Sequence, residues 1–172
     1  MMSFAATLED ISIQPKELDV PPMLLNCRNG VLDLATGDLI PHRYSQGHLL
    51  TKMAPVIYRA DAACPRWEKF LDEIFAGDAE MISYIQRVVG YAITGAVTEK
   101  AVWIFHGSGN NGKTTLLKVI REMLGVKDDG YGGAVDINTL MKPKADDYTL
   151  RMIAAMQGKR FITASEPQDG AA

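Results

Sequence analysis

Apolar and polar positions repeat with two different periods along the chain, and each period predicts its own kind of element. In residues 65–75 and 81–92 the apolar side chains recur three and four positions apart, as on one face of a helix. We expect two helices here, separated by Gly77, which ends the first, and Asp78, which caps the second. Helices joined this closely should pack as an antiparallel pair, with their apolar stripes in the core. The stripes are Trp67, Phe70, Leu71, Ile74 and Phe75 in the first helix and Met81, Ile82, Ile85, Val88, Val89 and Ala92 in the second.

Shorter apolar runs predict strands. Residues 29–43 hold two such runs around Thr36-Gly37-Asp38, residues suited to a tight turn, which indicates a hairpin. Residues 101–105 are continuously apolar, which favours a central strand covered on both faces. Two further strands are expected near 134–137 and over 160–165.

Two more helices complete the pattern. Residues 113–124 and 147–157 each precede a glycine that suits a helix end, and Asp146 or Asp147 suits the start of the second. A strand, a loop, a helix and a later strand, in this order, are typical of an α/β nucleotide-binding core. We therefore expect an arm or linker over 1–25, a hairpin with a helical preamble over 26–98, and a partial core over 99–172.

Composition excludes several classes of protein. Hydrophobic residues make up 47 % of the 172 positions, charged residues 23 %, and the net charge is −3. These are globular proportions without a large basic field. Cys27 and Cys64 lack metal-site spacing, which favours reduced thiols. Neither a signal peptide nor an apolar run of membrane-spanning length is visible, so we expect a cytoplasmic protein.

The clearest chemistry lies in one glycine-rich stretch. Gly107 and Gly112 allow backbone turns that point successive N–H groups at phosphate oxygens. Lys113 would bring a positive charge to the β and γ phosphates, and Thr114 a hydroxyl to Mg²⁺. The N-terminus of the next helix favours the same anion. The stretch reads Gly107-Ser108-Gly109-Asn110-Asn111-Gly112-Lys113-Thr114-Thr115, which fits GxxxxGK[ST] at every fixed position. It predicts a site for a nucleoside triphosphate with Mg²⁺.

An ATPase of this type also needs a carboxylate, delivered by a strand beside the first one. The strand expected over 160–165 is followed directly by Glu166. We expect Lys113 and Glu166 as catalytic residues, and Thr114 and Glu166 as Mg²⁺ ligands. Many such sites end in two acids, whereas Ser165 precedes Glu166 here. Glu166 therefore suits either the metal ligand or the general base, and a solvated turn residue is the alternative.

These segments together resemble phage and plasmid replicative primase–helicases, whose C-terminal part is a superfamily 3 helicase. The resemblance runs from about residue 23 to the end of the chain. It is carried by "NCRNGVLDLATGDLIPHR" (26–43), "CPRWEKFL" (64–71), the helical preamble through 107, "GSGNNGKTTL" (107–116) and "MQGKRFITASE" (156–166).

The resemblance implies a hexameric ring that hydrolyses ATP with Mg²⁺ and moves along single-stranded DNA, encoded by a phage, prophage or plasmid in a bacterial host. The fold expected is a hairpin and helical subdomain followed by an incomplete, AAA+-like P-loop core. In the family, a DNA-contacting segment, a sensor strand and an arginine finger follow the acid, but this chain ends six residues after Glu166. We therefore expect a fragment with weak or no unaided hydrolysis.

Two alternatives stay open. One is a non-catalytic oligomerisation or docking module with an idle P-loop, and the other is a small kinase, which the long segment before the loop disfavours. A modest cation cluster predicts at most weak binding to single-stranded DNA, and a solvated basic face is the plainer interpretation. The cluster comprises Lys142, Lys144, Arg151, Lys159 and Arg160, and the three histidines, His42, His48 and His106, match no metal pattern.

Overall fold

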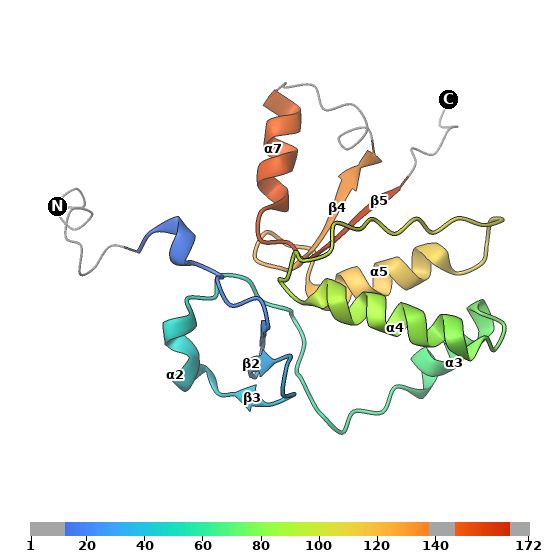
Figure 1. Cartoon of the computed structure of the whole chain (residues 1–172), viewed down its shortest axis with the longest axis horizontal. Helices are drawn as coiled ribbons and strands as arrows, with labels where there is room; N and C mark the ends of the chain where they lie inside the picture. The colour runs from blue at the N-terminus through green and yellow to red at the C-terminus, as the bar shows by residue number, and fades with distance from the viewer. Residues whose placement is uncertain (1–12, 138–146, 166–172) are drawn as a thin grey trace.

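The computed structural model describes residues 13–137 and 147–165, and their fold is mixed α/β (Figure 1). The described strands form a three-stranded antiparallel sheet and a two-stranded parallel sheet. In chain order the elements are the 3-10 helix η1 (Pro15–Glu17), β1 (Leu24–Cys27), β2 (Gly30–Asp33), β3 (Leu39–Ile40), α2 (His42–Ser45), the 3-10 helix η2 (Gln46–His48), α3 (Pro65–Ile74), α4 (Ala79–Ile93), α5 (Lys113–Leu124), β4 (Gly132–Asp136), α7 (Asp147–Met156) and β5 (Phe161–Ser165).

The antiparallel sheet has the order β1-β2-β3. The hairpin expected over 29–43 is confirmed as β2 and β3, in which Val31 pairs with Ile40. The sequence pattern did not reveal β1, which joins β2 through Arg28 and Asn29 and pairs Cys27 with Gly30. The segment after η2 returns to this sheet, where the Ala54 amide donates to the Asn26 carbonyl at 2.8 Å.

The two helices of the preamble are confirmed with their expected ends. Pro65 occupies the first position of α3, where the missing N–H costs no helical hydrogen bond. Gly77 follows α3 with φ of +75°, and the Asp78 carboxylate accepts from the Met81 amide at 2.9 Å at the start of α4. In the α4 stripe Ile85 and Val88 are buried, whereas Met81 in the first turn is exposed.

The strand expected over 101–105 is wrong. These residues form no strand, and Val102 and Ile104 are 89 % and 84 % exposed. The Trp103 indole N–H donates to the Tyr84 hydroxyl of α4 at 3.2 Å, so α4 covers one side of the segment. A central strand also needs neighbours along its backbone edges. β4 and β5 hydrogen-bond to each other instead, which leaves alternate side chains of this run in solvent.

The parallel sheet packs against α5, which begins and ends where the sequence predicts. β4 and β5 pair from Gly132 opposite Phe161 to Asp136 opposite Ser165, with α7 in the connection. The apolar face of α5 meets the antiparallel sheet, α3 and α4 in one cluster. Its buried members are Leu25, Cys27, Leu32, Ala54, Leu71, Ile85, Leu116, Ile120, Leu124 and Tyr131.

Candidate phosphate-binding loop

The glycine-rich stretch forms an irregular loop that leads directly into α5. Asn110 lies in the left-handed region with φ of 61°, which asparagine tolerates better than most residues. Gly112, with φ of 81°, is the N-cap of α5. Left-handed residues of this kind let successive N–H groups of a loop point toward one anion.

Close packing, in addition to the positive φ, requires a glycine at position 112. A Cβ atom at this position would lie 2.5 Å from Cγ2 of Ile74 and 3.4 Å from Cε2 of Phe70. The end of α3 therefore packs directly against the loop. The sequence placed both residues in a core stripe, and nothing in that stripe pointed to the loop.

Lys113 folds back over the loop. Its ammonium donates to the Gly107 carbonyl at 3.0 Å, to the Ser108 carbonyl at 3.4 Å and to Oδ1 of Asn111 at 2.6 Å. The positive charge thus lies over carbonyl oxygens of the same loop whose N–H groups the motif assigns to phosphate. A phosphate oxygen that replaced the Asn111 amide oxygen would gain a charge-assisted hydrogen bond.

The rest of the loop is open to solvent. Ser108, Gly109, Asn110 and Asn111 are exposed, and so are Thr114 and Thr115 in the first turn of α5. The first N–H groups of any α-helix lack partners within the helix. The first turn of α5 therefore carries amides without helical partners, two hydroxyls on exposed residues and the Lys113 ammonium.

The expected acid, Glu166, lies outside the described residues. β5 reaches Ser165, and α5 is tied to it because the Arg121 guanidinium donates to the Thr163 hydroxyl at 3.0 Å. β4 starts beside the C-terminal end of α5, where the Gly132 amide donates to the Gly125 carbonyl at 2.9 Å. In Figure 1, α5 lies nearly across the view and β5 rises from this region toward the upper right, so the two elements diverge.

The described part of the expected cation cluster makes contacts within the protein. Arg151 pairs with Asp147, and Lys159 donates to the Lys127 and Gly130 carbonyls. Arg160 donates to two carbonyls, and burial lowers the pKa of its guanidinium. A solvated basic face is therefore the wrong description of Lys159 and Arg160, whereas Lys142 and Lys144 lie outside the described residues.

The remaining candidates do not assemble into a metal site. No group of three or more His, Cys, Asp or Glu side chains with metal-binding geometry occurs within 13–137 and 147–165. His42 contacts Oδ1 of Asn26 through Nε2 at 3.0 Å, and His106 is exposed beside the loop. Cys27 is buried and Cys64 exposed, and both are free thiols.

Comparison with known proteins supports the N-terminal part of the resemblance. Residues 1–76 match the family model described as D5 N terminal like, a domain found in phage and plasmid primase–helicase proteins. Within the described residues, the match spans the antiparallel sheet, α2, η2 and α3, and it ends before the loop. No curated protein matches the chain. Across the described ranges, none of the helices has the length and apolar character needed to cross a bilayer.

Proposed function

We propose that this chain is the ATP-binding part of a DNA-replication helicase of the primase–helicase type. The observation that carries the proposal is the loop itself, where a left-handed turn at Gly112 leads into a helix and the Lys113 ammonium lies over the loop carbonyls. The match of residues 1–76 to a domain found in primase–helicases supports the replication context.

The residues present fit Mg-ATP by their donor chemistry. Loop amides and Lys113 would hold the phosphates, Thr114 would ligate Mg²⁺, and Thr115 lies beside them at the start of α5. When bound, Mg²⁺ neutralises charge that develops on the phosphates. In the proposal Glu166 supplies the carboxylate to the metal or the attacking water, and the helicase works as a hexamer on single-stranded DNA.

Thermal unfolding in Mg-ATP tests the proposal. A ligand at about 100 times its Kd stabilises the folded state by about 2.7 kcal/mol. For a chain of this size that raises Tm by roughly 5–10 °C. We expect this rise in the unaltered protein and in Lys118→Ala, which removes an exposed lysine from the same helix. We expect Lys113→Ala to abolish it.

A docking module with an idle loop is the second candidate. It is favoured by one observation: the Lys113 ammonium already has three acceptors within the loop. Under that hypothesis, millimolar Mg-ATP leaves Tm unchanged in all three proteins. A shift of equal size in Lys113→Ala would also contradict nucleotide binding at this loop.

A further inference from the structure

A solvent-open cavity of about 580 Å³ lies between the first two turns of α3 and the first two turns of α5. This volume is within the range of small-molecule sites, roughly 300–1,000 Å³. Arg66, Trp67 and Phe70 line it from α3, and Thr115 and Val119 line it from α5. Its wall is thus mostly apolar and aromatic, with one guanidinium and one hydroxyl.

The cavity begins where the loop ends. Thr115, on its wall, follows Thr114, to which the motif assigns the metal. Phe70, also on its wall, approaches Gly112 at the other end of the loop turn. Thr115 and Phe70 thus adjoin both the loop and the cavity, so a ligand whose phosphates lie in the loop would reach this space past Thr115.

The aromatic wall suits a flat ring. The Trp67 and Phe70 ring centroids lie 5.5 Å apart, with their planes tilted by 32°. Trp67 is half-buried, so part of its indole is accessible from the cavity. Nucleobases stack on such side chains whatever their sequence, because every base presents a π face.

We propose that this cavity holds the base of the nucleotide, stacked on Trp67, while its phosphates occupy residues 107–114. The inference rests on the proposed function and adds its base subsite. It assigns a ligand-binding role to α3, within the segment that matches the D5 N terminal like family.

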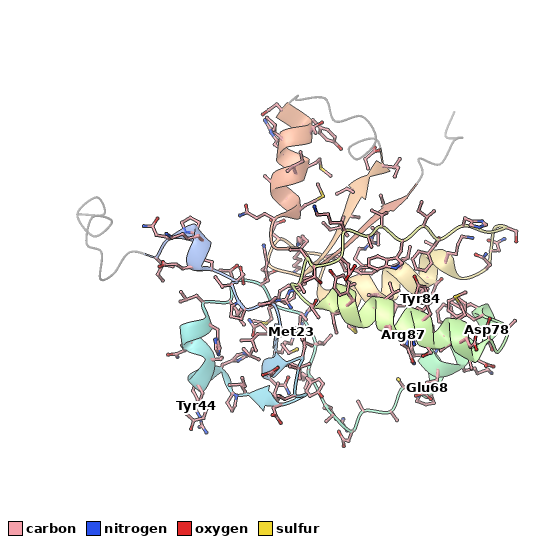
Figure 2. The ribbon with its side chains drawn as sticks, in the orientation of Figure 1. Met23, Tyr44, Glu68, Asp78, Tyr84 and Arg87 are labelled. Atoms are coloured by element: carbon pink, nitrogen blue, oxygen red, sulfur yellow. The ribbon has the colours of Figure 1, made fainter. Side chains whose placement is uncertain are left out.

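Mg-tripolyphosphate, which has the phosphates without the nucleoside, separates the two sites. By calorimetry we expect Mg-ATP to bind at least about fivefold more tightly than Mg-tripolyphosphate, the lower end of the range for base stacking. Trp67→Ala should remove this advantage and leave the tripolyphosphate Kd unchanged. Tyr44→Ala, which removes an exposed aromatic side chain from α2, away from α3, should change neither (Figure 2).

Cys64 provides a second measurement in the unaltered protein, so the test stands even if Trp67→Ala does not fold. Cys64 lines the cavity and is exposed, whereas Cys27 is buried, so a maleimide should react first at Cys64. We expect Mg-ATP at saturation to slow this reaction several-fold and Mg-tripolyphosphate to leave its rate unchanged.

The possible results separate the two proposals. Equal affinities for both ligands, with Cys64 unprotected by ATP, would refute the base subsite and leave the phosphate loop standing. An equal loss of affinity for both ligands in Trp67→Ala would show a structural role for Trp67 and refute stacking on it. Failure of both ligands to bind would refute the proposed function and the base subsite with it.

Discussion

At the scale of single residues, Arg160 and Tyr131 connect parts of the chain that lie far apart in sequence. The Arg160 guanidinium donates to the Ile93 carbonyl at 3.0 Å and to the Leu24 carbonyl at 2.7 Å. It also lies 4.4 Å from the centroid of the Tyr131 ring. One side chain thus joins the start of β5 to the end of α4, to β1 and to the residue before β4.

Arg160→Met should lower the free energy of unfolding by about 2–4 kcal/mol, because two partly buried carbonyls lose their donor. Urea denaturation measures this change. Arg151→Met is the matched control, since Arg151 is exposed and its pair with Asp147 contributes at most about 1 kcal/mol. Equal effects of the two substitutions would contradict the linking role of Arg160.

The burial of Tyr131 predicts that the free energy of unfolding falls at alkaline pH. Burial raises the pKa of its hydroxyl, against the opposing effects of the Asn26 amide and the Arg160 charge. A raised pKa in the folded state gives stability that is fully present below the unfolded value, about 10, and lost as pH rises above it.

Tyr131→Phe isolates this effect. At pH 8 the substitution should cost about 1 kcal/mol, because the hydroxyl no longer donates to the Lys52 carbonyl. Above pH 10 the unaltered protein loses the contribution of Tyr131, so the difference between the two proteins should shrink. Denaturation curves at pH 8 and pH 11 measure it, and a difference that grows with pH would contradict the assignment.

At the scale of elements, the contact between α3 and the loop holds the loop in place at Gly112. Gly112→Ala should destabilise the protein by at least about 2 kcal/mol, because alanine is strained at φ of 81° and its methyl group would meet Ile74. Gly109→Ala is the control, since a Cβ there meets nothing within 4 Å. Thermal unfolding of both variants checks this; equal Tm values would show that α3 does not hold the loop.

Elements with local signals were predictable from the sequence. Pro65, Gly77 and Asp78 mark the ends of α3 and α4, and Gly125 marks the end of α5, because each acts through its own backbone or cap. Whether the segments 24–27 and 101–105 form strands depends on their partners instead. A short run such as Leu24–Cys27 becomes a strand only because β2 lies beside it, and 101–105 has no such neighbour among the described residues.

The candidate site also has a part that the sequence predicts and a part that only the fold reveals. The motif identified the loop residues, since their types and spacing are local. The packing of Phe70 and Ile74 against Gly112 and the cavity beside Trp67 arise from the fold. Periodicity alone showed only that these side chains share a helix face.

At the scale of the whole molecule, one buried cluster crosses the segments that the sequence predicts as separate. It includes Leu25 and Leu32 from the antiparallel sheet, Ile85 from α4 and Leu116 from α5. The residues that match the D5 N terminal like family therefore share their core with the helix that follows the loop.

A shared core predicts a single cooperative unfolding transition. Far-UV circular dichroism and tryptophan fluorescence should give the same midpoint in urea, because Trp67 packs against the cluster and Trp103 against α4. Two separate midpoints would show that the preamble and the loop region unfold independently.

The central claim is that the amides of 107–114 and the Lys113 ammonium bind the phosphates of a nucleotide. Backbone amide NMR of the ¹⁵N-labelled protein during a Mg-ATP titration tests it most directly. We predict that the largest shift changes occur at Gly107–Thr115 and disappear in Lys113→Ala. Loop amides that stay unchanged at millimolar Mg-ATP, or changes confined to the antiparallel sheet, would contradict the claim.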